Sequence, residues 1–71
     1  MMMTIRPRLK AILEENGTKQ RWLCEKTGLD KNAVSRLVLG WSLPTLPNAY
    51  KIARALGKSV EEIWVWEDDG E

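Results

Sequence analysis

Two short helical segments joined by a glycine turn constrain the fold of this chain more than any other feature. Residues 20–40 read QRWLCEKTGLDKNAVSRLVLG, and Gly28 divides this stretch into two amphipathic halves. Glycine favours the left-handed conformation that ends a helix and redirects the chain. The pattern therefore predicts two helices packed around a tight turn. Their inward residues are predicted to be Trp22, Leu23, Cys24, Val34, Leu37 and Val38.

The spacing of apolar residues along the rest of the chain predicts a small all-α fold. Leu9, Ile12 and Leu13 recur at the i, i+3, i+4 spacing of an amphipathic helix, and Pro7 suits the first turn of that helix. No segment shows the clear alternation that is typical of a strand. A compact domain over residues 1–66 is expected. Its five helices are predicted at about residues 6–16, 19–27, 31–39, 46–56 and 60–65.

Capping residues mark the ends of these predicted helices. Thr18 is expected to cap the second helix, because Lys19 has no acceptor side chain. Asp30 and Thr45 are expected to cap the third and fourth helices, and the sequence SVEE from Ser59 predicts a capping box. Glycine follows four of the helices, at residues 17, 28, 40 and 57. The inward residues of the last two helices are predicted to be Leu46, Ala49, Ile52, Ala53, Leu56, Val60, Ile63 and Trp64.

Composition excludes several functional classes. The 71 residues include one cysteine and no histidine, so the chain has neither an internal disulfide nor a histidine-containing metal site. Because there is also no glycine-rich phosphate loop, catalysis is not expected and no cofactor is predicted. No apolar run reaches the roughly 18 residues of a membrane span, and no small-molecule ligand is indicated. The free thiol suits a reducing cytoplasm, which is the expected location.

The charges of the chain are unevenly distributed, although the net charge is only +1. Residues 1–60 contain all 11 lysines and arginines and four acidic residues, a net charge of +7. Residues 61–71 contain six acidic residues and no cation, a net charge of −6. This segregation predicts a basic body that can bind an anionic polymer, with an acidic tail over residues 67–71. A tail that only keeps the protein soluble is the alternative.

The exposed side of the predicted helix 31–39 carries hydrogen-bonding and cationic side chains. Four such residues lie at i, i+1, i+4 and i+5 and so share one face. They are Lys31, Asn32, Ser35 and Arg36. Lysine and arginine can donate to guanine O6 and N7, and asparagine can pair with adenine N6 and N7. A helix of this kind, braced by a neighbour, fits the major groove of DNA; a merely solvated face is the alternative interpretation.

The chain resembles the lambda-repressor-like helix-turn-helix family, which includes regulators of the Cro, cI and XRE type. The resemblance spans residues 9–64. Its matching features are Gln20 at the start of the second helix, the Leu23–Cys24 step, the Gly28–Leu29 turn, then Val34, Leu37, Gly40 and Pro44, and the ending KIARALGKSVEEIW over residues 51–64. The resemblance implies a five-helix fold whose members bind operator DNA as symmetric dimers.

The resemblance also implies roles for individual residues. The four residues on the exposed face of the third helix occupy the family's base-reading positions, and Gln20 occupies a phosphate-contacting position. The loop after Gly40 is the second phosphate anchor, which includes Ser42. Trp41 stands where the family often has lysine or arginine, so that contact is lost or replaced by a backbone N–H. Leu13 and Val38 replace an ion pair that many members carry.

Further phosphate contacts follow from the residues themselves. Lys19 and Gln20 lie at a helix N-terminus, where free backbone N–H groups and the helix dipole favour an anion. Lys10 and Ser42 are candidates for the same belt of contacts. The partner expected from this surface is double-stranded DNA.

Each of the four tryptophans is expected either to pack in the core or to lie at an interface. Trp22 and Trp64 are predicted to pack at least partly in the core, whereas Trp41 and Trp66 are difficult to bury in so small a domain. Trp64 and Trp66 are the candidates for a homodimer interface, because exposed tryptophan is enriched at interface hot spots. The predicted function is a homodimeric, DNA-binding repressor. A protein-interaction module, such as an antitoxin-like partner of a toxin, is the alternative from another class.

Overall fold

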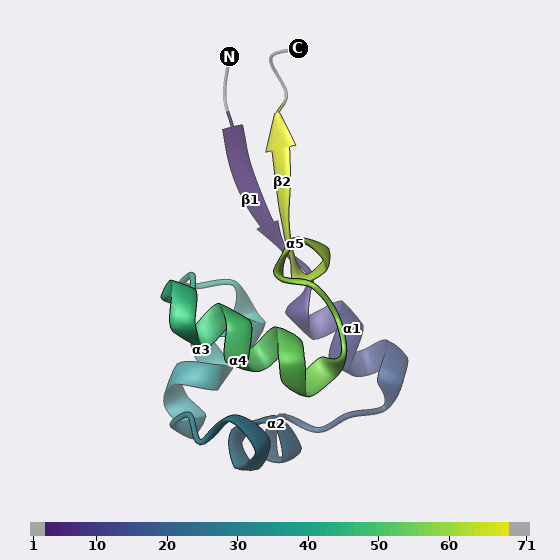
Figure 1. Ribbon diagram of the computed structural model, residues 1–71, viewed down its shortest axis with the longest axis vertical. Coiled ribbons are helices and arrows are strands. Elements are labelled where there is room, and N and C mark those ends of the chain that lie inside the picture. Colours follow the sequence, from purple (N-terminus) through teal and green to yellow (C-terminus); the bar gives the residue numbers. More distant parts are fainter. Residues whose placement is uncertain (1–2, 69–71) are drawn as a thin grey trace.

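A bundle of five helices with a two-stranded sheet at one end forms the structure (Figure 1). The computed structural model describes residues 3–68. Its elements are β1 (Met3–Pro7), α1 (Leu9–Asn16), α2 (Gln20–Thr27), α3 (Lys31–Leu39), α4 (Leu46–Leu56), α5 (Val60–Ile63) and β2 (Trp64–Asp68). The sheet projects from the helical body on the side opposite α2 (Figure 1). The prediction of an all-α fold is therefore approximately right, and it is wrong at the two ends of the chain.

The two strands pair antiparallel and bring the ends of the described chain together. Ile5 lies opposite Trp66, and Pro7 lies opposite Trp64. The Arg8 N–H donates to the carbonyl oxygen of Ile63 at 2.7 Å, which joins the start of α1 to the end of α5. This pairing was not predicted, because each segment is short and its partner is distant in the sequence. It is decided by tertiary proximity rather than by local propensity.

Two predicted helix boundaries change as a result. The helix predicted at residues 6–16 begins at Leu9, and Pro7 is the last residue of β1 rather than part of the first helical turn. The helix predicted at residues 60–65 ends at Ile63, because the following residues are extended in β2. Proline is tolerated in β1 because a two-stranded sheet leaves each strand with a free edge.

The predicted acidic tail is partly a strand. Glu67 and Asp68 belong to β2, and the rest of the predicted tail, residues 69–71, lies outside the described residues. The Nε atom of Arg6 is 3.1 Å from Oε2 of Glu67, so an ion pair links the two strands. Both side chains are substantially exposed, and such surface pairs contribute only ~0–1 kcal/mol.

The core draws on every helix and on the first residue of β2. Its buried members are Leu9, Ile12, Leu13, Leu23, Val34, Leu37, Val38, Ala49, Ile52, Ala53, Ile63 and Trp64. The predicted core position of Trp64 is confirmed, since only 7% of this residue is exposed. Its indole N–H has no hydrogen-bond acceptor among the described residues. Leu13 and Val38, which replace the family's ion pair, are both buried in this core.

Five residues that were predicted to point inward are less buried than expected, and two of them, Leu56 and Val60, are half-buried at the edge of the core. Leu46 is the first residue of α4 and is 66% exposed, because the helix has not yet reached the core at that point. Trp22 is 37% exposed, and the Lys26 ammonium lies 5.8 Å from the centre of its ring. Cys24 is half-buried and packs against the edge of the core.

Most predicted caps are present. Asp30 accepts a hydrogen bond from the Asn32 N–H at 2.9 Å, and Thr45 accepts one from the Asn48 N–H at 3.4 Å. The prediction that Thr18 caps α2 is wrong, because its side chain makes no capping bond to this helix. The Thr18 N–H donates to the carbonyl oxygen of Leu13 at 2.9 Å and completes the end of α1. The N-cap of α2 is the next residue, a lysine, and no side chain caps this helix.

The turn between α2 and α3 depends on Gly28, which has φ +75° and donates its N–H to the carbonyl oxygen of Cys24 at 2.8 Å. No atom lies within 4 Å of the position that a Cβ would occupy, so a substitution is strained only by its backbone conformation. We expect Gly28→Ala to lower the free energy of unfolding by about 1–2 kcal/mol. In a domain of this size, each 1 kcal/mol corresponds to a fall in Tm of roughly 4–8 °C.

Gly28→Asn is the matched control, because asparagine tolerates the left-handed conformation better than alanine does. Its Tm should fall between those of the wild type and Gly28→Ala. An alanine variant as stable as the wild type would show that this turn does not require a positive φ.

The capping box at the start of α5 makes stability depend on pH. The Ser59 N–H donates to Oε1 of Glu62 at 2.8 Å, and this bond, followed by the one with the Ser59 side chain, lowers the pKa of Glu62 below its ordinary 4.5. Because the folded state favours the carboxylate, the stabilisation is present above pH 4.5 and is lost as pH falls through the lowered pKa. An NMR titration of the Glu62 carboxyl should give this lowered value.

Ser59→Ala should return the pKa of Glu62 only part of the way, because the backbone donor remains. Glu62→Gln, which cannot ionise, should remove this residue's share of the acid sensitivity in denaturation experiments. An ordinary pKa for Glu62 in the folded wild type would contradict the capping geometry.

Candidate nucleic-acid interface

The outer side of α3 is presented by a helix whose inner side is buried. Val34, Leu37 and Val38 face the core and are at most 8% exposed. Lys31 and Asn32, in the first turn of the helix, are exposed. The predicted base-reading residues therefore lie on the solvent side of α3, where Arg36 is exposed and Ser35 is half-buried.

A groove between α2 and α3 brings three of these residues together with the start of α2. Its volume is about 580 Å³. It is lined by Gln20, Arg21, Cys24, Glu25, Lys31, Asn32 and Ser35. Arg36 does not line this groove; it lies in the last turn of α3, one turn beyond Asn32. The groove thus joins two predicted classes of contact, one from each helix.

A second groove, between α1 and α2, collects three of the predicted phosphate contacts. Lys10, Lys19 and Gln20 line it, although they come from α1, the following loop and the start of α2. Its volume is about 450 Å³. Gln20 lines both grooves, so the two meet at the start of α2. The second groove is also lined by Glu14 and by the apolar residues Leu13, Val38 and Leu39. The predicted phosphate contact at Ser42 lines neither groove and is exposed in the loop after α3.

The uncapped start of α2 suits an anion. No side chain caps this helix, and the Trp22 N–H already donates to the carbonyl oxygen of Lys19 at 3.1 Å. The first two N–H groups, of Gln20 and Arg21, therefore suit a phosphate oxygen, and the helix dipole favours negative charge there. Because Thr18 does not cap α2, the predicted phosphate contacts Lys19 and Gln20 lie beside backbone N–H groups that no side chain occupies. A side-chain cap would have competed with phosphate for these donors.

Trp41 does not replace the cationic phosphate contact with its own backbone N–H. That N–H donates to the carbonyl oxygen of Arg36 at 2.9 Å and completes the end of α3. The indole is 77% exposed. The loop after α3 therefore offers a large exposed aromatic residue at this position, with Ser42 beside it.

Arg21 is a groove residue that the sequence reasoning missed. It follows Gln20 at the start of α2, a position whose adjacency to the predicted phosphate contacts could have indicated it. Its Nε atom is 3.6 Å from Oε2 of Glu25, one helical turn later, and both side chains are exposed. A surface pair of this kind is weak, so Arg21 can leave it for a stronger anionic partner.

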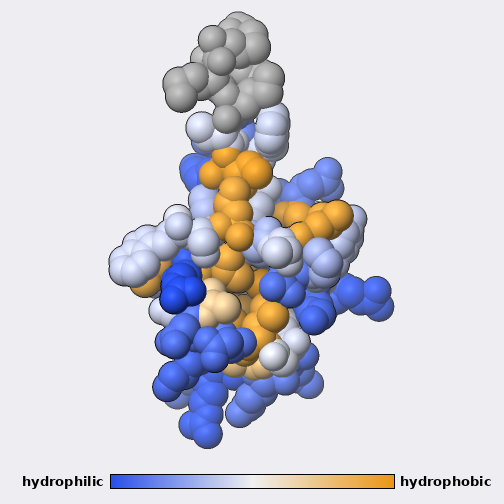
Figure 2. Space-filling model, turned by 90° about the vertical axis from the view of Figure 1, so that its left-hand side faces the viewer, coloured by the Kyte–Doolittle hydropathy of each residue, from blue (hydrophilic) through white to orange (hydrophobic). Residues whose placement is uncertain are grey.

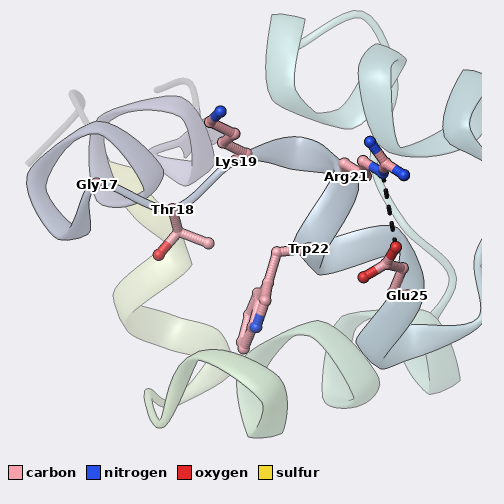
Figure 3. Close-up of a pocket in the computed structure, with 6 residues that line it drawn as sticks. All are labelled: Gly17, Thr18, Lys19, Arg21, Trp22 and Glu25. Carbon is pink, nitrogen blue, oxygen red and sulfur yellow. Dashed lines mark ion pairs between the residues drawn. The ribbon is translucent and has the colours of Figure 1, made fainter.

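A hollow at the corner of α1 and α2 has no such convergence of polar groups. It is lined by Gly17, Thr18, Lys19, Arg21, Trp22 and Glu25. Figure 3 shows the Trp22 ring and the Arg21–Glu25 ion pair pointing to different sides of α2. The Arg21 and Glu25 side chains pair with one another on one side of α2 and the Trp22 ring lies on another, so the residues that line the hollow do not converge on one point.

Two further properties describe residues 3–68. They contain no group of three or more potential metal ligands. None of their helices combines the length and the hydropathy that a membrane crossing requires.

Two proteins with similar sequences are both described as helix-turn-helix-type transcriptional regulators. A helix-turn-helix-type transcriptional regulator of Methanothermobacter thermautotrophicus, itself uncharacterized, is 36% identical over 58 residues, which are 80% of this chain and 84% of the relative. An uncharacterized regulator of the same type from Archaeoglobus fulgidus is 29% identical over 65 residues, covering 92% and 93%.

The fold and the sequence indicate the same family. A crystal structure of an inferred DNA-binding protein from Bacteroides fragilis matches with a TM-score of 0.75 and 30% identity, covering 93% of this chain and all of that one. Residues 9–63 match the family model described as helix-turn-helix, from the start of α1 to the end of α5. The chain therefore belongs to the helix-turn-helix family, in agreement with its resemblance to lambda-repressor-like regulators.

Proposed function

We propose that this protein is a sequence-specific DNA-binding transcriptional regulator that binds operator DNA as a homodimer. The observation that carries the proposal is the polar outer side of α3, held outward by its buried inner side. Membership of the helix-turn-helix family supports DNA as the partner, because its relatives are transcriptional regulators. These relatives do not favour the alternative of a protein-interaction module.

Base reading is assigned to α3. Arg36 and Lys31 have the length and charge to donate to guanine O6 and N7, and Asn32 can pair bidentately with adenine. Ser35 is half-buried and closer to the helix axis, so it reaches a base edge only when the helix is fully inserted. Each good bidentate contact discriminates against the wrong base by about 1–3 kcal/mol.

Phosphate binding is assigned to the surface beside α3. Lys19 and Gln20 act with the free N–H groups of α2, Lys10 extends this contact along α1, and Ser42 contacts the backbone on the other side of α3. Phosphate contacts set the position of a protein on DNA but do not read its sequence. They make affinity depend on salt, because each neutralised phosphate releases counterions.

Repression would result from the binding of the protein to its operator. Two copies on one operator place their α3 helices in successive major grooves, about 34 Å apart. A protein bound across two grooves blocks access to the DNA that it covers, and so a promoter that overlaps the operator is silenced.

The two classes of contact predict different mutant behaviour. Arg36→Ala should weaken binding to the preferred sequence by roughly 5–150-fold, the equivalent of one bidentate contact, and barely change binding to other sequences. Lys19→Ala should weaken binding to all duplexes alike and reduce the slope of log affinity against log salt by about 1. The preferred duplex would first be selected from a random pool, and affinities would then be measured by fluorescence anisotropy at two salt concentrations.

Lys51→Ala is the control for net charge. Lys51 is exposed on α4 and lines neither the groove between α2 and α3 nor the groove between α1 and α2. Its loss should therefore change DNA affinity less than the loss of Lys19. Equal effects of the Arg36 and Lys19 substitutions on preferred and other duplexes would contradict the division between base and phosphate contacts.

A further inference from the structure

Trp41 is the most exposed of the four tryptophans, and it lies in the loop that directly follows α3. It is 77% exposed, against 62% for Trp66, which lies on the sheet that projects away from the helical body (Figure 1). A tryptophan side chain combines a large apolar ring with one polar N–H group, a combination that is favourable where a binding partner covers the ring. The described chain leaves this ring uncovered at the end of the helix to which base reading is assigned.

The backbone of Trp41 is fixed to the last turn of α3. Its N–H donates to the carbonyl oxygen of Arg36 at 2.9 Å, and Gly40 before it has a left-handed conformation, with φ +79°. Because the inner side of α3 is buried in the core, the helix holds the start of this loop in a fixed position relative to Arg36. The indole is therefore exposed but is attached at a defined place beside the proposed base contacts.

The chain on both sides of Trp41 carries no charge. Residues 37–50 read LVLGWSLPTLPNAY and contain no lysine, arginine, aspartate or glutamate. Figure 2 shows the side of the molecule on which α4 begins, where hydrophobic atoms form a band between hydrophilic flanks. A contact between this loop and DNA must therefore come from hydrogen bonds and apolar packing, because no side chain in the loop can form an ion pair with a phosphate.

We propose that the indole of Trp41 binds the sugar–phosphate backbone at the edge of the major groove that α3 occupies. The ring packs on a deoxyribose, and the indole N–H, which can only donate, binds a phosphate oxygen. The inference rests on the proposed function and adds to it an uncharged contact at a position where the family resemblance led us to expect a cation.

The dimensions of DNA favour this partner for the ring. The major groove is about 12 Å wide, close to the roughly 10–12 Å diameter of a helix with its side chains. A chain that leaves the end of α3 therefore meets the backbone at the edge of the groove, where a phosphate contact is already assigned to Ser42. Tryptophan has only two rotatable side-chain bonds, so placing it against a sugar costs little conformational entropy.

An uncharged contact differs from a cationic one in its response to salt. A lysine or arginine that neutralises a phosphate releases counterions and steepens the slope of log affinity against log salt by about 0.9. An indole releases none, so it should strengthen binding by the same factor at every salt concentration. Because it contacts the backbone and not a base, it should also strengthen binding to all sequences alike.

The test compares substitutions of Trp41 in the full chain by fluorescence anisotropy, with the preferred duplex and an unrelated duplex over a range of salt concentrations. Trp41→Ala should weaken binding to both duplexes by roughly 10-fold, the equivalent of one hydrogen bond to a charged group, and leave the salt slope unchanged. Trp41→Phe keeps an aromatic ring but loses the donor, so its affinity should be intermediate. Trp41→Lys should recover affinity at low salt and steepen the slope by about 0.9.

Tyr50→Ala is the matched control for the loss of an exposed aromatic residue. Tyr50 belongs to the same uncharged stretch and is 57% exposed, but it lies on α4. This variant should stay within about twofold of the wild-type affinity, as is usual for a surface substitution. Equal losses for the two alanine variants, an unchanged affinity for Trp41→Ala, or an unchanged slope for Trp41→Lys would each overturn the inference.

Two further measurements keep the outcomes distinct. Circular dichroism checks that each variant folds, and Trp41→Phe replaces Trp41→Ala if the alanine variant does not. A duplex with the binding site of a single copy should show the same loss for Trp41→Ala as the full operator; a loss confined to the full operator would place the indole between two copies and overturn the inference. A wild type that binds no duplex would contradict the proposed function itself, whereas a protein that binds equally well without the indole would contradict this inference alone.

Discussion

The burial of the inner side of α3 is the constraint on which both the fold and the proposed DNA-binding surface depend. Val34, Leu37 and Val38 are almost completely removed from water, and each such side chain stabilises the folded state by about 1.5–3 kcal/mol. Rotation of α3 would expose them. The direction of Asn32 and Arg36 is therefore set by hydrophobic packing on the opposite side of the helix. A surface held in this way loses little conformational entropy when a ligand binds.

The sheet gives the small bundle a second surface without disturbing the first. Its pairing carries Ile5 and Trp66 away from the helical body, and the buried Trp64 ties β2 to the core. A two-stranded sheet alone is marginally stable in water, so packing at Trp64 and the Arg8–Ile63 backbone bond support it. The polar and apolar surfaces consequently occupy different elements of one small domain.

Capping residues show where prediction from the sequence succeeds and where it fails. Asp30, Thr45 and Ser59 were correctly predicted because each bonds to a backbone group within three residues. Thr18 has the same side-chain chemistry but lies one residue before the N-cap of α2, which is Lys19. Residue type alone did not decide at which residue this helix begins. The same loop left the start of α2 open for the proposed phosphate contact.

The sequence by itself determined the helices, the turns between them and the set of polar residues on α3. These depend on bonds and spacings within about four residues, which remain the same wherever the helix packs. Only the tertiary structure decided the sheet, the exposure of Leu46 and the position of Trp66 beside Ile5. The sheet and the Trp66–Ile5 pair join segments from opposite ends of the chain, and their stability comes from packing and pairing that exist only once the ends have met. The exposure of Leu46 depends on how the first turn of α4 lies against the rest of the core.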